Sequence, residues 1–321
     1  AFLTLLFHLP TTAADKRLPA FPGAEGFGMF SRGGRGGQVY VVKNLNARGP
    51  GSLREAVEAE GPRIVVFAVG GTIDLEGPLA IGNPYCTIAG QTAPGGGITL
   101  KGGTLIPQAD HLVIRYIRCR PGEQAGDGDA VSIYRPLDEN DPDRPLAGNI
   151  ILDHVSASWG SDEVLSVTGS VDNVTIQWSI VSEGVNNSYG SLLRPSVECH
   201  MTFHHNLYVH NRARNPFAGS YRDKANHCDW RNNVVYNGGR SHGGSNWHKL
   251  FTDRWGPENV GRLRMNYVNN YWIRGPRGDE TLFLGGDQAT IFQSGNLLDA
   301  TDNGVFDGVD RGWNVFANYR H

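Results

Sequence analysis

Short runs of alternating apolar and polar residues recur along the chain from residue 63 onwards, and most of them end in Asn or Gly. Val, Ile, Thr and aromatic residues fill the alternate positions, a pattern typical of strands and not of helices. When the runs are aligned, one turn position holds in succession Ile117, Val155, Ser179, Asn206, Asn233, Asn270 and Asn296. Their spacings are 38, 24, 27, 27, 37 and 26 residues. A period in this range indicates a solenoid.

The spacing of the runs selects one sheet architecture. A doubly wound sheet needs a crossover helix between parallel strands, and no helical pattern of useful length separates these runs. Antiparallel hairpins would place a turn about every 8–12 residues, which is shorter than the spacing of these runs. We therefore predict an all-β fold over residues 18–321, a single-domain right-handed parallel β-helix. Asn at the repeated turn would form a hydrogen-bonded ladder and adopt the left-handed bend there. The two longest spacings predict inserted loops at 121–148 and 237–262.

A solenoid needs a cap on its first coil, and residues 51–59 (GSLREAVEA) predict a short N-terminal capping helix. Ser52 has the residue type of an N-cap, and Glu55, three positions later, completes a capping box. The apolar stripe of this helix is expected to consist of Leu53, Ala56 and Val57. This stripe would close the end of the core.

Residues 1–17 are expected to be a leader and not part of the fold. Residues 1–9 (AFLTLLFHL) are almost entirely apolar, and small residues of the kind that precede signal cleavage follow. We interpret the segment as the remnant of a secretory signal. The protein is therefore expected to be secreted or periplasmic.

Composition removes several other classes. Glycine accounts for 43 of 321 residues without a G-X-Y period, which excludes collagen. The net charge of −3 argues against general nucleic-acid binding, and no apolar run reaches the length of a membrane helix. The four cysteines form no C-x-x-C pair, which disfavours a zinc or redox site. Disulfides and buried free thiols both remain open for Cys86, Cys119, Cys199 and Cys228.

Charge is segregated between neighbouring coils. Residues 120–170 hold ten acidic residues against three arginines, whereas residues 205–240 hold six cations against two acidic residues. Two acidic pairs, at 127/129 and 162/163, fall on adjacent coils, and converging carboxylates are what Ca²⁺ prefers. Arg212 and Arg214 lie two apart on extended chain and can share a face, which suits recognition of a carboxylate. The alternative is that both segments are ordinary solvated loops.

Several segments together resemble pectate lyases of polysaccharide lyase family 1. These are AFPGAEGFG, GGRGGQVYVVKNLNARGPGSLREAV, NIILDHVSASWGSDEVLSV, NVTIQWSIVSEG and HHNLYVHNRARNP, and the match covers roughly residues 20–240. The resemblance implies a parallel β-helix, Ca²⁺ as cofactor, and β-elimination on an acidic polysaccharide, polygalacturonate. It also implies that the essential arginine, eight residues after the HHN asparagine, is Arg214.

The resemblance implies further site residues. Asp127, Asp129 and Asp162 match the calcium aspartates, and His154 matches the histidine of the Ile-Asp-His motif, with a role in substrate binding. The chain departs from the pattern where a calcium carboxylate, a substrate lysine and a second arginine are replaced by Ser166, Tyr189 and Gly219. Residues expected to compensate are Glu163 at the metal and Arg194 and Arg222 at the substrate, while Arg212 is expected to bind substrate beside Arg214.

Two rival functions stay open at this point. A polygalacturonase-like glycoside hydrolase on the same fold would need two carboxylates flanking the scissile bond, and Asp153 and Asp162 could supply them. A non-catalytic polysaccharide-binding β-helix would show aromatic platforms without a charged centre, and the clustered arginines argue against it. For each of these functions we expect a monomer that binds an acidic polysaccharide and neither nucleic acid nor a membrane.

Overall fold

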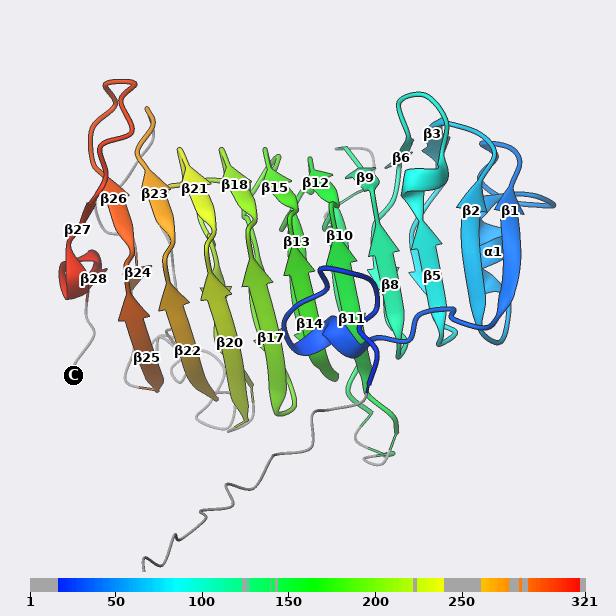
Figure 1. Ribbon diagram of the computed structural model, residues 1–321, viewed down its shortest axis with the longest axis horizontal. Helices are drawn as coiled ribbons and strands as arrows, with labels where there is room; N and C mark the ends of the chain where they lie inside the picture. Colours follow the sequence, from blue (N-terminus) through cyan, green and yellow to red (C-terminus); the bar gives the residue numbers. More distant parts are fainter. Residues whose placement is uncertain are drawn as a thin grey trace, which may run out of the picture.

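The computed structural model describes residues 17–122, 126, 128–138, 140–141, 144–221, 224–239, 261–276, 283–284 and 288–317. Figure 1 shows the coils stacked along one axis, from β1 at the blue end to β25 and β26 at the orange end. Each complete coil contributes one strand to each of three parallel sheets. The expected leader lies outside the described residues, apart from Arg17. No helix among the described residues is long and apolar enough to cross a membrane.

The first sheet has ten strands, and its members come first in each coil. They are β1 (Gln38–Val42), β2 (Arg63–Phe67), β5 (Cys86–Ala89), β8 (Leu112–Arg115), β11 (Ala147–Asp153), β14 (Val171–Gln177), β17 (Cys199–His204), β20 (Ala225–Arg231), β22 (Arg262–Val268) and β25 (Ala289–Ser294).

The second sheet also has ten strands, and all of them except β27 come after a strand of the first sheet. They are β3 (Gly71–Asp74), β6 (Ile98–Lys101), β9 (Ile117–Arg120), β12 (Ser156–Ser158), β15 (Ile180–Ser182), β18 (Leu207–Val209), β21 (Val234–Tyr236), β23 (Tyr271–Ile273), β26 (Leu297–Asp299) and β27 (Val309–Asp310). Only the β26–β27 pair is antiparallel among the described strands.

The third sheet has six strands and carries the candidate site. They are β4 (Leu79–Ile81), β7 (Leu105–Pro107), β10 (Val131–Arg135), β13 (Leu165–Gly169), β16 (Leu192–Pro195) and β19 (Phe217–Ala218). Two more short strands, β24 (Phe283–Leu284) and β28 (Phe316–Ala317), pair near the C-terminus. The remaining elements are η1 (Phe27–Phe30), α1 (Leu53–Glu58), η2 (Gly90–Thr92) and η5 (Gly312–Val315).

The core is a set of apolar stacks that run through the coils. In the first sheet, Ile88, Ile114, Leu152, Ile176 and Phe203 pair in successive registers, and each is at most 1% exposed. A side chain at the same register in every coil meets its equivalent about 4.8 Å away, so the stack excludes water along its length. The parallel β-helix predicted from the repeat is confirmed.

The asparagine ladder predicted at the repeated turn is also present, and it lies at the corner between the first and second sheets. Asn233 Oδ1 accepts from the Asn206 backbone N at 3.0 Å and from its Nδ2 at 3.1 Å, and the same pattern continues through Asn270 to Asn296. The left-handed residue was predicted wrongly, because it is the residue before each ladder position. His205, for example, has φ 55°. The ladder side chain must point into the coil, and the preceding residue makes the bend.

The helix that caps the first coil forms as predicted, with a modified capping box. Ser52 Oγ accepts from the Glu55 backbone N at 3.2 Å, while Glu55 Oε2 reaches back to the backbone N of Gly51 at 2.6 Å. Leu53, Ala56 and Val57 are buried. Beneath them, the fully buried Arg63 guanidinium donates to the carbonyl oxygens of Ala56 and Val57.

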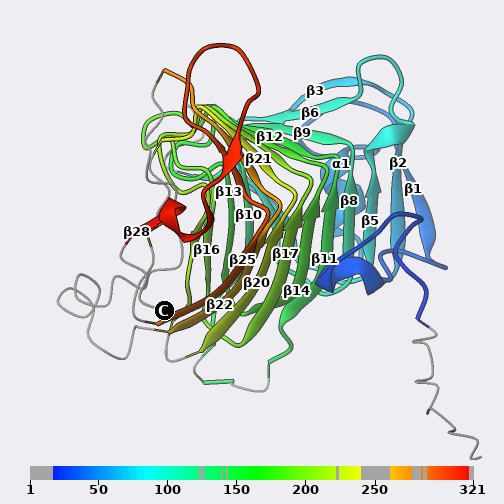
Figure 2. The same ribbon diagram turned by 60° about the vertical axis from the view of Figure 1, so that its left-hand side comes forward.

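The N-terminal segment that follows the leader crosses the outer face of the first sheet, with η1 lying in front of β11 and β14 (Figures 1 and 2). Glycine makes this close approach possible. A Cβ at Gly28 would lie 2.3 Å from the Ile150 carbonyl oxygen, and one at Gly34 would lie 1.8 Å from that of Arg63. The glycine-rich segments therefore serve packing against strands.

All four cysteines, Cys86, Cys119, Cys199 and Cys228, are buried free thiols. Of the two predicted loop insertions, 121–148 contains β10, and residues 240–260 of the other lie outside the described residues.

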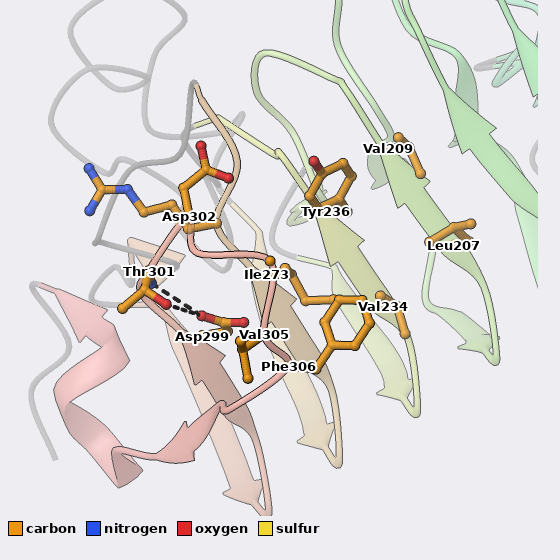
Figure 3. A pocket seen from close by; sticks show the side chains of 12 residues that line it. Leu207, Val209, Val234, Tyr236, Ile273, Asp299, Thr301, Asp302, Val305 and Phe306 are labelled. Carbon is orange, nitrogen blue, oxygen red and sulfur yellow. Dashed lines mark hydrogen bonds between the residues drawn. The ribbon is translucent and has the colours of Figure 1, made fainter.

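At the C-terminal end, Val305 and Phe306 fold over the outer face of the second sheet. Figure 3 shows the apolar pocket of about 440 Å³ that they form with Leu207, Val234 and Ile273.

Candidate active site

Three carboxylates converge at the corner between the second and third sheets. Asp129 lies two residues before β10, and Asp162 and Glu163 lie just before β13 on the next coil. Because β10 and β13 pair in register from Val131 and Leu165, the turns that precede them lie side by side. One oxygen from each carboxylate lies within 4.8 Å of the others.

Hydrogen bonds fix this cluster in place. The Glu163 backbone N donates to Asp129 Oδ1 at 3.1 Å, and Asn187 Nδ2, from the following coil, donates to Asp162 Oδ1 at 2.9 Å. Burial and then the negative charge of Asp162 raise the pKa of Asp129 to about 7. Ser166, where the resemblance expects a fourth carboxylate, is buried on β13, so the described cluster consists of three carboxylates.

Arg214 lies beside this cluster, three coils along from Asp129. It precedes β19, adopts φ 60°, and is held by its carbonyl oxygen, which accepts from the Ser191 backbone N at 2.6 Å. Its Nη1 contacts Oε1 of the buried Glu163. Burial lowers the pKa of Arg214, while Asp162 and Asp129 oppose that shift. The Arg214 side chain, 24% exposed, thus lies partly buried beside carboxylates at the third sheet.

Tyr189 organises both arginines of this region. Its ring lies 3.9 Å from Arg214 Cζ and 5.5 Å from Arg212 Cζ, and its hydroxyl accepts from Arg212 Nη2 at 3.5 Å. Parallel bridges link Glu163 to Tyr189 and Tyr189 to Ala213, so the three turns stack. The sequence analysis noted Tyr189 only as the residue that replaces the substrate lysine of the family. Its signal was its place one coil after Glu163, at the same point of the repeat.

Other predicted site residues lie elsewhere. Asp127 and Arg222 are outside the described residues. Arg194 is 4% exposed, with Cζ 3.8 Å from the Tyr221 ring, so it supports the wall of the site from within. His154 stands at the other corner, between the first and second sheets, where it stacks on Tyr116 with ring centroids 4.6 Å apart. The structure does not bring His154 together with the carboxylate cluster.

The hydrolase alternative loses its carboxylate pair. Asp153 is 1% exposed at the end of β11, and its oxygens are held by Arg115 Nη2 at 2.7 Å and Gln177 Nε2 at 2.7 Å. Asp162 lies at the opposite end of the following strand, β12. Two carboxylates at different corners of the coil cannot flank one scissile bond.

The carboxylate cluster fits a calcium ion. Ca²⁺ binds hard oxygen ligands at about 2.3–2.6 Å, so two ligands on opposite sides of one ion lie about 5 Å apart. Three carboxylate oxygens within 4.8 Å of one another meet this condition. Burial, together with the nearby charge of Asp162, raises the pKa of Asp129, and a bound cation would oppose both effects by stabilising the charged carboxylate.

The chain is similar to pectate lyases in sequence and in fold. No protein-family model matches the chain. It is 40% identical over 299 residues to a probable pectate lyase C of Aspergillus flavus, an alignment that covers 92% of this chain and 64% of that protein. The chain thus spans somewhat under two thirds of the length of this curated relative. The resemblance to pectate lyases stated from the motifs is confirmed.

Solved structures of pectate lyases share the fold. A pectate lyase from Bacillus sp. N165 in complex with trigalacturonate superposes with a TM-score of 0.60 at 14% identity, covering 90% of this chain and 91% of that one. A thermostable pectate lyase superposes with a TM-score of 0.58 at 16% identity, covering 87% and 85%. At these identities the superpositions establish a common β-helix architecture.

Proposed function

We propose that this chain cleaves polygalacturonate by β-elimination, as a pectate lyase. The observation that carries the proposal is the contact between Arg214 and a cluster of three carboxylates on the outer edge of the third sheet. The relatives named probable pectate lyase C support it, because they align with 92% of the chain. The convergence of acids and arginines also favours an enzyme over a binding β-helix without a charged centre.

The reaction removes the C5 proton of a uronate and expels the oxygen on C4. The electron pair of the C5–H bond forms the C4–C5 double bond, and the C4–O bond breaks with its pair on oxygen, which takes a proton from water. Arg214 is the proposed base. Burial lowers its pKa, which favours the neutral guanidine that can accept the proton. The stack on Tyr189 fixes the plane of the guanidinium.

Asp129, Asp162 and Glu163 would hold Ca²⁺, whose chemistry there is to neutralise the charge that develops next to C5. Arg212 is exposed next to Arg214 and would bind a substrate carboxylate through its fork of N–H groups. Arg194 would act from below, by packing against the aromatic wall of the site. The proposed roles of Asp127, Arg222 and His154 stay predictions.

The test is a spectrophotometric assay on polygalacturonate with and without a chelator. A C4–C5 double bond conjugated to the carboxylate absorbs in the ultraviolet, so the absorbance should rise with calcium and stop rising with excess chelator. New reducing ends without this absorbance would refute the lyase and support a hydrolase. Secretion, predicted from the apolar leader, and the monomeric state stay predictions.

A further inference from the structure

A second charged groove lies on the outer face of the second sheet, at its N-terminal end. It has a volume of about 670 Å³, and its floor consists of outward-facing residues of β3, β6 and β9. Lys101 and Arg120 face each other across adjacent strands, as do Thr99 and Arg118. Trp159 forms one wall. The groove is therefore basic on its floor and aromatic on its side.

The two arginines of this groove are held in place without neutralisation. Arg118 donates from Nε to Thr99 Oγ1 at 2.9 Å and from Nη2 to the Gly96 carbonyl oxygen. Arg120 donates to the Ser156 carbonyl oxygen at 2.5 Å and to its hydroxyl at 2.7 Å. Within the described part of the chain, neither arginine pairs with a carboxylate. Each retains N–H groups with no protein acceptor there, since a guanidinium has five.

Other charged residues around the groove do not neutralise the positive charge of the two arginines. Lys101 is paired with Asp74 at 2.9 Å, so its charge is largely compensated. Burial and then the proximity of Arg118 lower the pKa of Arg120, with Glu183 acting in the opposite direction. Two guanidinium groups that are fixed by neutral acceptors form an anion site that needs no rearrangement before it binds.

The exposed Trp159 indicates which kind of anion the groove would bind. Its side chain is 45% exposed at a left-handed turn of φ 63°, and its ring lies 5.7 Å from Arg120 Cζ. An exposed indole beside guanidinium groups can cover the apolar face of a ring whose substituents are charged. The outer-face threonines of β3 and β6 add hydroxyl groups that suit a polyhydroxylated ligand.

The groove is separate from the candidate active site but shares its turns. Trp159 and Asp162 belong to the same turn between β12 and β13, and Arg120 ends the strand whose chain leads on to Asp129. The Ser161 backbone N donates to the Gly128 carbonyl oxygen at 2.9 Å, which ties the two turns together. The carboxylates precede the third sheet, whereas the groove covers the second.

We propose that this groove is an anchoring site for an acidic polysaccharide, in which Arg118 and Arg120 bind uronate carboxylates and Trp159 stacks on a pyranose ring. The choice of uronate rests on the proposed function. Such a site holds a long chain near the carboxylate cluster without taking part in cleavage. It raises affinity for polymer and does nothing for an oligomer that occupies only the active site.

Affinity electrophoresis in gels that contain polygalacturonate and a chelator measures this binding without turnover. Arg118→Gln and Trp159→Ala should each weaken retardation by about fivefold or more, the loss expected for a charged hydrogen bond or a stacked ring. The matched controls are Arg264→Gln, an exposed arginine on β22, and Trp178→Ala, a tryptophan 50% exposed at the other corner. Both controls should bind as the parent chain does.

Kinetics provide the second readout. Arg118→Gln and Trp159→Ala should raise KM for long polygalacturonate by about fivefold and leave kcat, the melting temperature and kcat/KM for trigalacturonate unchanged. Wild-type affinity in both variants, no binding by the parent chain, or equal weakening by Arg264→Gln would overturn the anchoring site. Weakening by Arg118→Gln alone would reduce it to a simple anion site and overturn the saccharide assignment. Loss of the proposed lyase function would show separately, as absence of ultraviolet product in the parent chain.

Discussion

Replacing Arg214 by lysine tests the proposed mechanism most directly. Arg214 Nη1 contacts Glu163, whose side chain is 3% exposed, so removing the charge outright would leave a buried carboxylate unpaired. Breaking such a pair costs about 3–5 kcal/mol, which would confuse loss of fold with loss of chemistry. Lysine keeps the positive charge next to Glu163. It loses the planar group that stacks 3.9 Å from the Tyr189 ring, and it moves the nitrogen that would take the proton.

The expected loss is kinetic. A general base contributes about 10²–10⁴-fold to the rate, so Arg214→Lys should lower kcat on polygalacturonate by at least about a hundredfold. The melting temperature should move by a few degrees at most, since about 1 kcal/mol corresponds to about 2–4 °C in a chain of this size or somewhat smaller. The assay follows ultraviolet product over a range of substrate concentrations, with thermal unfolding measured on the same samples.

Arg212→Lys is the matched control, because Arg212 is an exposed arginine whose Cζ also lies near the Tyr189 ring, at 5.5 Å. It should raise KM more than it lowers kcat, as expected for a residue that only binds substrate. If Arg214→Lys kept more than about a tenth of the parent kcat, well outside the range for a general base, Arg214 would not be the base. Equal losses of kcat in both variants would also refute the distinction drawn between them.

Three further outcomes follow from the structure. Activity should fall on chelation and return with Ca²⁺ but not with Na⁺, because three carboxylate oxygens converge within 4.8 Å; full activity in excess chelator would remove the metal from the mechanism. Asn233→Leu should lower the free energy of unfolding, measured in urea, by about 2–4 kcal/mol, because it leaves polar groups of the buried Asn206 and Phe203 without hydrogen-bond partners. A decrease below about 1 kcal/mol would contradict the stabilising role of the ladder. Burial lowers the pKa of His204 to about 4, below its value of about 6.5 in the unfolded chain. The contribution of neutral His204 to the free energy of unfolding is therefore complete above pH about 6.5. It decreases by about 3 kcal/mol as the pH drops toward 4. His204→Gln should flatten the stability curve over that interval, and parallel curves for the two proteins would contradict the assignment.

The coil architecture could be predicted because a solenoid writes its period into the sequence. The alternation of apolar and polar residues predicted the strands, and the regular spacing of Asn206 and Asn233 predicted the asparagine ladder. The bend itself was placed one residue too late. Alternation cannot distinguish an inward side chain that follows a bend from the residue that makes it. The structure makes the distinction through φ, which is 55° at both His205 and Asn232.

The site was predictable only in part, for a physical reason. Arg214, Asp129 and Asp162 were identified through motifs, whereas Tyr189 and Asn187 were not. These two lie in short turns that have no pattern of their own, and the register of neighbouring coils brings them to the cluster. His154, also identified through a motif, lies at the corner between the first and second sheets, and its role in substrate binding stays a prediction. A motif match gives a residue's place along the chain, but its side of the coil depends on which corner the turn forms.

A β-helix can build a site from single side chains because neighbouring coils contribute residues at or next to one register: Tyr189 pairs with Glu163 and with Ala213, the residue before Arg214. Asp129, Glu163, Tyr189 and Arg214 precede β10, β13, β16 and β19, and these strands lie side by side. The strand spacing of about 4.8 Å then sets the separation between successive groups. Two acidic turns are followed along the axis by an aromatic turn and a basic one. With the proposed roles, a chain laid along that axis would meet the cation site at one coil and the base two coils further on.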